Sequence, residues 1–249
     1  HFTAHLISAY RKMDKNFKID WQKKLNQLPA TDWQKIYHLV IFPVYKESLP
    51  VVRGSFKALA DTHYPKNKMI VILAIEERAG EEAKELAKKI KKEFGDKFFR
   101  FLVTVNPEGI EGEIAGKGSN ETWAGRQAKK EIIDPLKIPY QNIIVSCFDS
   151  DTQVYNQYFT CLTYHYLTDP MALRSSFQPI PLYFNNILEA PFFARLASSC
   201  NVFWEMTLQQ RPEKLATYSS HSMSFKALVE MNFWQVNIVA EDAGIFWKA

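Results

Sequence analysis

Glycine is scarce in this sequence, which has nine glycines in 249 residues. That scarcity, with 47% hydrophobic residues, excludes a linker-rich or disordered chain. Long apolar runs are lacking too, so the sequence predicts neither a signal peptide nor a membrane-spanning helix. An excess of one charge is also missing: the net charge of +4 is too small to indicate a nucleic-acid partner by itself.

Cysteine is rare and shows no framework. Cys147, Cys161 and Cys200 form no C-x-x-C pair, and an odd count of this kind favours buried thiols in a reducing compartment. We therefore expect a cytoplasmic protein. The chain starts without Met and ends abruptly at Ala249, a pattern that fits a piece of a longer protein.

Positive charge is concentrated near the start of the chain. Six basic residues stand there against Asp14 and Asp20, namely Arg11, Lys12, Lys15, Lys18, Lys23 and Lys24. The ordinary interpretation is a solvated helix face. The more specific interpretation is a segment that binds a membrane surface, at the cytoplasmic face of that membrane.

What is abundant is a run of buried-strand patterns alternating with helical patterns. Strands are predicted at 38–42, 69–75, 98–105 and 143–148, and helices at 51–61, 81–94 and 121–133. Successive βαβ units indicate an α/β fold with a mostly parallel central sheet flanked by helices. We expect the first strand to break at Pro43 and a glycine-rich loop to precede the helix at 121.

The remainder of the chain is less regular. Residues 1–34 indicate two short helices, and helices are predicted at 154–167 and 190–209. Prolines in the apolar stretch 177–186 exclude a central strand there. A polar loop is expected at 219–225, leading into a further helix.

Two carboxylates one residue apart follow the fourth strand. On an extended chain Asp149 and Asp151 point to the same side, at the carboxyl edge where open α/β sheets bind ligands. Paired carboxylates suit Mg²⁺ or Mn²⁺, which usually shares its coordination with substrate phosphates. The alternative is a polar turn that simply ends a core strand.

Further motifs follow in a recognisable order. They are the Pro43–Glu47 loop, Glu76 after the second strand, Lys117-Gly118-Ser119-Asn120, Asp149-Ser150-Asp151, His221-Ser222-Met223 and Glu241-Asp242. In this order they resemble the inverting family 2 glycosyltransferases with a GT-A fold, which include cellulose, chitin and hyaluronan synthases and ceramide glucosyltransferase. The resemblance covers about residues 38–247.

The resemblance implies a role for each motif. The nucleotide-sugar donor, UDP-linked by this likeness, would contact Pro43, Tyr45, Glu47, Glu76, Lys117, Gly118, Asn120 and Asp149. Asp149 and Asp151 would hold Mg²⁺ or Mn²⁺, and Asp242 would act as the catalytic base. The acceptor side would comprise Gln178, His221, Ser222 and Glu241. An acceptor glycan or lipid is implied, with no nucleic acid.

The resemblance also implies a division of the chain. A helical extension at 1–34 would precede a single GT-A (Rossmann-like) domain at 35–249, with a nucleotide-binding half at 35–152 and an acceptor-binding half at 153–249. The Gln/Arg-x-x-Arg-Trp motif of processive members does not follow Asp242. Either the chain ends before it or the enzyme adds single sugars.

Other interpretations stay open at this point. Glu76 would pair with Arg78 as an ordinary strand-end acid, Lys117 would be a solvated loop residue, and Glu241-Asp242 would begin a helix. A haloacid-dehalogenase-like phosphatase also places Asp-x-Asp after a strand, although its motif opens the fold. An inactive GT-A module that only binds nucleotide sugars is the non-enzymatic alternative.

Overall fold

The structure is a computed structural model that describes residues 2–183, 185, 187–188, 190–211 and 217–238. The chain divides into two compact units. The larger comprises Trp21–Phe177 and Thr217–Ala249, and the smaller comprises His1–Asp20 and Gln178–Ala216.

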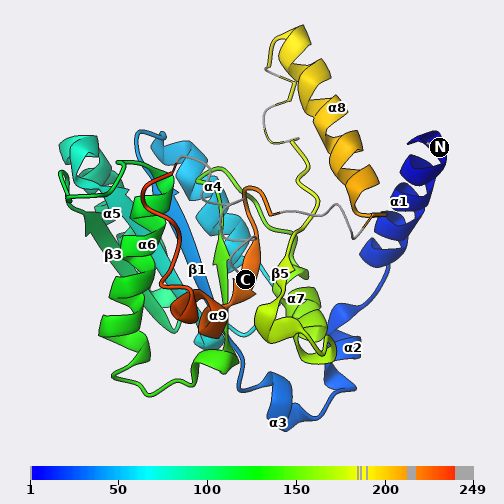
Figure 1. The fold of residues 1–249 in the computed structure, drawn as a ribbon, viewed down its shortest axis with the longest axis horizontal. Coiled ribbons are helices and arrows are strands. Elements are labelled where there is room, and N and C mark those ends of the chain that lie inside the picture. Colours follow the sequence, from blue (N-terminus) through cyan, green and yellow to red (C-terminus); the bar gives the residue numbers. More distant parts are fainter. Residues whose placement is uncertain (1, 184, 186, 189, 212–216, 239–249) are drawn as a thin grey trace. The chain divides into compact units, whose positions relative to one another are not determined.

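The described part of the larger unit is built on a six-stranded sheet in the order β3-β2-β1-β4-β6-β5 (Figure 1). The strands are β1 (Tyr37–Val44), β2 (Met69–Glu76), β3 (Arg100–Asn106), β4 (Ile143–Cys147), β5 (Ser176–Phe177) and β6 (Ser222–Ser224). The first four run parallel, whereas β6 is antiparallel to both β4 and β5. The predicted α/β class with a mostly parallel sheet is confirmed.

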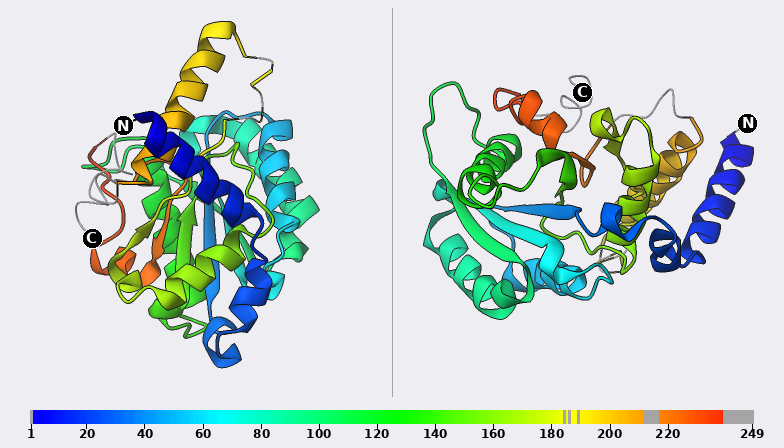
Figure 2. Two further views of the ribbon diagram at one scale, coloured as in Figure 1. Left: turned by 90° about the vertical axis from the view of Figure 1, so that its right-hand side faces the viewer. Right: turned by 90° about the horizontal axis from the view of Figure 1, so that it is seen from below.

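Helices cover both faces of the sheet, as the right-hand view of Figure 2 shows. Alternate residues of β1 face opposite sides: Val40 and Phe42 pack under α4 (Leu49–Ala60) and α5 (Gly80–Phe94). Leu39 and Ile41 pack under α6 (Lys117–Ala128), α9 (Phe225–Glu230) and their neighbours. Burial on both faces explains why β1 and β2 are continuous apolar runs in the sequence.

Shorter elements complete the larger unit. They are α2 (Trp21–Asn26), α3 (Ala30–Trp33), α7 (Tyr158–Thr168), a π turn at Lys129–Ile133 and short 3-10 turns at Lys66–Lys68, Glu77–Ala79, Gly95–Lys97, Tyr140–Asn142 and Ala172–Arg174. The helix predicted at 154–167 therefore begins at Tyr158.

The smaller unit contains α1 (Phe2–Phe17) and α8 (Phe192–Leu208). Ala9 of α1 is buried against Val202 and Met206 of α8, with Leu6 and Met13 packed beside them. The helix predicted at 190–209 is confirmed. No helix among the described residues combines the length and apolarity needed to cross a bilayer.

The predicted break at Pro43 is wrong, because Pro43 lies inside β1 and pairs with Ala74 of β2. The carbonyl of Ile41 accepts from Phe148, so residue 43, two positions on, also directs its backbone toward β4. The β1–β4 register ends at Ile41–Cys147. Proline's missing N–H is therefore not needed at that position.

Two further predictions need correction. The expected glycine-rich loop stops at Gly116, and Lys117, Gly118 and Asn120 form the first turns of α6. Ser119 secures this start, because its hydroxyl donates to the Gly116 carbonyl at 3.0 Å and accepts from the Gly116 N–H at 3.3 Å. The expected polar loop at 219–225 contains β6, whose three residues pair with β4.

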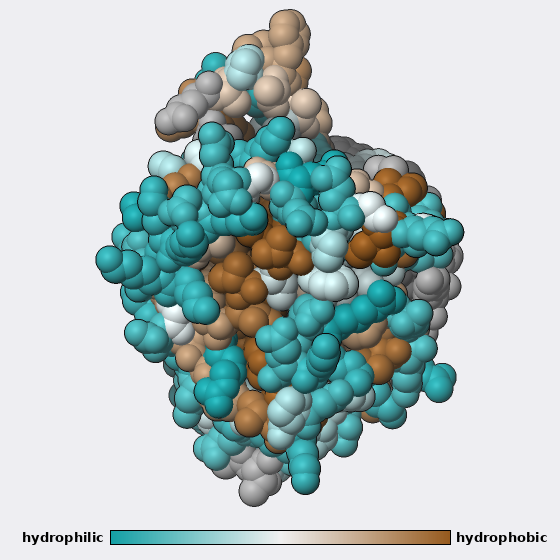
Figure 3. Space-filling view, turned by 90° about the vertical axis from the view of Figure 1, so that its left-hand side faces the viewer, coloured by the Kyte–Doolittle hydropathy of each residue, from teal (hydrophilic) through white to brown (hydrophobic). Residues whose placement is uncertain are grey.

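The sheet has an open edge at β3, because no described strand lies beyond it. From the side on which β3 lies in Figure 1, apolar side chains gather between hydrophilic margins (Figure 3). Phe101, Leu102 and Val103 are only partly buried on this strand, and Val105 is 37% exposed.

Candidate active site

Four loops converge where the parallel strands end. The chain runs outward from β1 through β2 to β3 and then returns to the other side of β1 as β4. The loops after β1 and β4, which begin at Tyr45 and Phe148, therefore flank the point where the strand order reverses. In open α/β sheets this switch point is the usual location of a ligand site.

Asp149 is the best-connected side chain at this edge. Its Oδ1 lies 3.1 Å from Nζ of Lys117, and its Oδ2 accepts a hydrogen bond from the Ser219 hydroxyl. The backbone N–H of Asp149 donates to the Ser220 hydroxyl at 3.3 Å, and that hydroxyl also lies 3.0 Å from the hydroxyl of Thr152. Asp149 is held at three atoms while its side chain stays 44% exposed, so it remains accessible to a ligand.

Ser219 and Ser220 are the residues that sequence analysis missed at this position. They belong to the polar run Ser219-Ser220-His221-Ser222, from which the sequence analysis chose only His221 and Ser222 as site residues. His221 and Ser222 are instead buried. The Ser222 hydroxyl lies 2.7 Å from that of Ser146 and 3.0 Å from that of Tyr158, in the interior of the larger unit.

Lys117 occupies an unusual position for a cation. It begins α6, where the helix dipole disfavours positive charge and attracts anions. Its ammonium lies 3.1 Å from Asp149 and 3.8 Å from the carboxylate of Glu121, whose side chain is completely buried one turn later. Glu121 was not predicted, although its spacing of four from Lys117 is a helical pair. The two acids stabilise a lysine aimed at the switch point.

Asp151 carries the second carboxylate of the pair and is exposed. Desolvation by the surrounding loops raises its pKa, and the negative charges of Asp149 and Glu47 raise it further. Glu47 itself accepts a hydrogen bond from the Tyr45 N–H at 2.7 Å. The loops after β1 and β4 thus bring three acidic side chains into one electrostatic environment.

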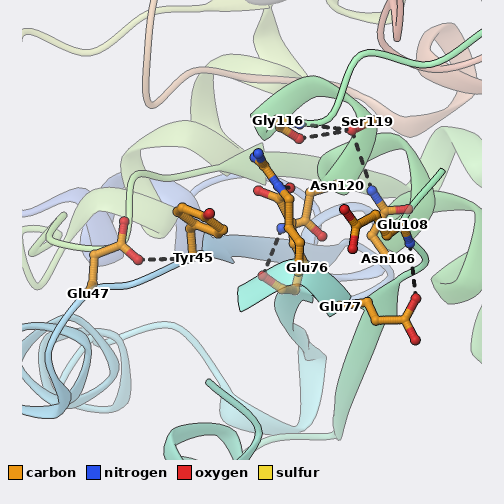
Figure 4. A network of polar contacts seen from close by, with 11 residues as sticks. Tyr45, Glu47, Glu76, Glu77, Asn106, Glu108, Gly116, Ser119 and Asn120 are labelled. Carbon is orange, nitrogen blue, oxygen red and sulfur yellow. Dashed lines mark hydrogen bonds and ion pairs between the residues drawn. The ribbon is translucent and has the colours of Figure 1, made fainter. Parts of the chain in front are cut away.

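A second polar group lies around the end of β2 (Figure 4). Glu76 is nearly buried and pairs with Nε of Arg78 at 2.6 Å, as the ordinary interpretation of this acid predicted. The guanidinium of Arg78 in turn lies 4.5 Å from the centre of the Tyr45 ring. A planar cation stacked on an aromatic ring, beside a buried acid, is a surface that suits a flat polar group such as a nucleobase.

A small pocket adjoins this group. Its lining includes Glu76, Arg78, Asn106, Glu108, Gly109, Ile110, Glu113 and Ser119. Asn106, which ends β3, was missed by sequence analysis; its signal was a lone amide after an apolar strand.

Two buried amides at this edge have spare hydrogen-bonding capacity. Asn106 donates to Ser119 at 3.4 Å, and Asn120 donates to the Ala74 carbonyl at 2.9 Å. The Oδ1 atom of each finds no partner among the described residues. A buried acceptor without a donor is costly, so these oxygens are candidates for contacts with a ligand's N–H groups.

The remaining predicted residues are two in the larger unit, one in the smaller unit and two outside the described residues. Gly118 is buried within α6, and Pro43 lies inside β1. Gln178 belongs to the smaller unit, where its carbonyl accepts from Gln209 at 3.1 Å. Glu241 and Asp242 lie outside the described residues.

Asp149 and Asp151 are the carboxylates at this edge that could bind a divalent cation. The described residues contain no group of three His, Cys, Asp or Glu side chains placed to hold a metal. Mg²⁺, however, commonly takes one or two carboxylates and completes its shell with water and substrate phosphates. The raised pKa of Asp151 reflects, after desolvation, a repulsion that a cation would relieve. Asp149 and Asp151 fit a metal shared with a diphosphate, and they do not form an all-protein cage.

Comparison with known proteins defines the fold. No protein family profile and no curated protein matches the sequence. Among solved structures, the mannosyltransferase PcManGT from Pyrobaculum calidifontis, in complex with GDP-Man and Mn²⁺, is similar with a TM-score of 0.56 and 14% identity. The match covers 98% of this chain and 62% of that one. The fold is GT-A-like.

TarS 1-349 from S. aureus in complex with UDP-GlcNAc also matches, with a TM-score of 0.49, 14% identity and coverage of 86% of this chain and 53% of that chain. This chain therefore spans between half and two thirds of the length of either of these two matched chains. Asp149 follows β4, the fourth strand of the chain, whereas the phosphatase alternative places its Asp-x-Asp motif after the first strand.

Proposed function

We propose that this protein is a glycosyltransferase that uses a nucleotide-sugar donor. One observation carries the proposal: at the switch point of a GT-A-like sheet, the Asp149 carboxylate is joined to Lys117, with Asp151 beside it. This arrangement offers a ligand with concentrated negative charge the Lys117 ammonium and two carboxylates that could bind a metal ion. A nucleoside diphosphate has that charge.

The donor would divide between two areas of the edge. The diphosphate would bind near Lys117 and the start of α6, where lysine and helix dipole both favour anions. The base would stack near Tyr45 and Arg78 and offer its N–H groups to Glu76, Asn106 and the adjoining amide of Asn120. Uracil can offer its single ring N–H to one of these acceptors, and we favour a UDP-linked sugar from the motif order of the sequence.

Asp149 and Asp151 would hold Mg²⁺ or Mn²⁺. When bound, such an ion supplies Lewis-acid stabilisation of the departing diphosphate. The protein's own contribution is to orient Asp149, through Ser219, Ser220 and Lys117, and to keep a lysine near the phosphates.

The chemical step requires a base for the acceptor hydroxyl. We propose Asp242 for this role, with Glu241 beside it in the chain, from the motif order of the sequence. Attack on the sugar from the face opposite the nucleotide forms the new C–O bond as the bond to phosphate breaks, so the anomeric configuration inverts. A glycan or lipid hydroxyl is the acceptor class.

Binding and transfer are tested separately. Thermal unfolding is measured with UDP-sugars and GDP-sugars, with and without Mn²⁺, because a ligand that binds the native state raises its apparent stability. We expect stabilisation by a UDP-sugar with Mn²⁺, lost in Asp151→Asn and retained in Asp96→Asn. Asp96 is a matched exposed control. It precedes β3, so it lies near the amino-terminal ends of the parallel strands, away from the ends where Asp149 and Asp151 lie.

Transfer is followed as UDP release and by NMR of the product's anomeric proton. Asp242→Asn should bind the donor and lose transfer. Binding without turnover in the unmodified protein would support the inactive module, and hydrolysis of a generic phosphate ester would support the phosphatase. No response to any nucleotide sugar would overturn the proposal.

A further inference from the structure

The first half of α8 is an apolar surface that no described residue covers. Every residue from Pro191 to Ala197 is exposed, and Phe192 and Phe193 are 65% and 80% exposed. Leu188, just before the helix, is 87% exposed. Soluble proteins rarely leave several neighbouring large apolar side chains in water, and where they do, the patch usually binds something.

The exposed apolar side chains continue along one side of the helix. Phe192, Leu196 and Phe203 recur with helical spacing, and Trp204 lies beside them at 55% exposure. The side that packs on α1 is different, because it is formed by Val202 and Met206. Thus α8 has one apolar face that is satisfied within the smaller unit and another that is not.

The neighbouring helix α1 supplies charge. Arg11, Lys12 and Lys15 are all exposed, and with Ala4, Ile7 and Ser8 they line a shallow depression on its surface. Ile7, Tyr10 and Phe17 of α1 are exposed apolar residues beside these cations. An exposed apolar stripe flanked by basic residues is the pattern of a helix that lies in a membrane interface.

We propose that the smaller unit is a membrane-docking element. The first turns of α8 place Phe192, Phe193 and Leu196 at the boundary of headgroups and acyl chains, and the cations of α1 bind anionic headgroups. Insertion is shallow. The 17-residue helix is about 25 Å long, which is shorter than the hydrocarbon core, and it carries Arg195 and Glu205.

Charge argues for a lipid surface over a second copy of the chain. Between residues 190 and 204 the sequence has no acid and one cation, Arg195, and the exposed cations of α1 lie in the same unit. A contact between two copies through α8 would offer these cations no acid from residues 190–204 to pair with. An anionic bilayer, in contrast, is complementary to both helices.

The test is co-sedimentation of the full chain with vesicles. Phosphatidylcholine vesicles are compared with vesicles that also contain phosphatidylglycerol, at low and high salt. We expect binding to the anionic vesicles that weakens with salt. Phe192→Ser with Phe193→Ser should reduce partitioning about tenfold or more, since the loss of two inserted rings removes apolar burial. Arg11→Glu with Lys15→Glu should weaken only the binding to anionic vesicles.

Matched controls come from the larger unit. Met171→Ser removes a side chain that is 57% exposed, and Lys89→Glu with Lys92→Glu reverses two exposed charges on α5. Neither should change vesicle binding. Circular dichroism and thermal unfolding confirm that the phenylalanine variant is folded, which we expect because both rings are exposed.

Three outcomes would overturn the inference: no binding to anionic vesicles, unchanged binding of the phenylalanine variant, or a solution dimer that this variant abolishes. The proposal does not rest on the glycosyltransferase assignment. Nucleotide-sugar binding is measured in the same samples, so that the two proposals can be rejected independently of each other.

Discussion

The ammonium of Lys117 lies 3.1 Å from a carboxylate oxygen of Asp149, which joins the first turn of α6 to the loop after β4. Neither residue is in a favourable place alone, because Lys117 begins a helix and Asp149 shares its region with Asp151 and Glu47. Together they form a polarised pair at the switch point. Such a pair favours ligand recognition over stability, and this distinction can be measured.

Replacement of Lys117 by methionine should weaken binding of UDP by about tenfold to a hundredfold, the usual contribution of a hydrogen bond to a charged group. The exposed pair with Asp149 contributes little to the melting temperature, but the buried Glu121 carboxylate loses its nearby cation, so a moderate fall is also expected. Isothermal titration calorimetry measures the affinity, and Lys92→Met, an exposed lysine on α5, is the control. Equal affinity in both variants would remove Lys117 from the donor site.

The buried amide of Asn106 should serve binding and not folding. Its Oδ1 finds no partner among the described residues, so Asn106→Ala should leave the free energy of unfolding within about 1 kcal/mol while UDP affinity falls about tenfold. Thr104→Val is the matched control, because Thr104 lies two residues earlier on β3 and its buried hydroxyl also has no described partner. If both variants bind UDP normally, the adjoining pocket is not the base site.

Acid should destabilise the protein through His38. The ring is completely buried, its Nε2 lies 2.8 Å from the Thr163 hydroxyl, and burial lowers its pKa to about 3. The rings of Tyr64 and Phe159 pack against it with centroids 4.5 and 4.8 Å away. No described carboxylate is bonded to the ring to stabilise its charged form.

The folded state therefore keeps His38 neutral while the unfolded state takes up a proton below about pH 6.5. The stabilisation is complete above pH 6.5 and is lost as pH falls toward 3. Between pH 7.5 and 5.5 this residue should remove about 1.4 kcal/mol of the free energy of unfolding. Urea denaturation at several pH values measures the slope. His38→Gln should reduce the slope, whereas His63→Gln, at an exposed position, should not.

Gly125 should be intolerant of a side chain. A Cβ at this position would lie 2.9 Å from two carbons of the Phe233 ring, on the face of the sheet covered by α6. We expect Gly125→Ala to cost about 1–3 kcal/mol, as overpacking usually does. Gly95→Ala is the control, because its Cβ would meet only Lys91 at an ordinary 3.5 Å. Similar melting temperatures for the two variants would show that Phe233 moves aside freely.

Local sequence patterns were enough to predict the frame of the larger unit. β2 is an unbroken apolar run, and α5 has an apolar stripe with acids in its first turn and lysines in its last. Such signals depend only on residues close together in the chain, so they can be recognised from the sequence alone. The Asp149–Asp151 pair was legible for the same reason, since both residues follow one apolar strand.

Local patterns failed where distant residues decide the structure. Gly116 and Gly118 suggested a loop up to residue 121, whereas α6 begins at Lys117 and Asn120 in its first turns donates to the Ala74 carbonyl of β2. Ser222 suggested a loop because it is polar, yet it pairs with Ser146 across a sheet whose interior satisfies both hydroxyls. Pro43 suggested a strand end, but the pairing of β1 with β4 stops at Ile41, so no residue of β4 needs a hydrogen bond from the position of Pro43.

By itself, the sequence determined the α/β class, the order of the four parallel strands and the helices between them, and the acids that follow β4, because periodic burial and chain neighbours encode them. Tertiary structure alone decided that Lys117, Ser219 and Ser220 meet Asp149, and that Asn106 and Asn120 lie at the same sheet edge. Those contacts join segments that are far apart along the chain. They exist only because the parallel sheet brings its strand ends to one side.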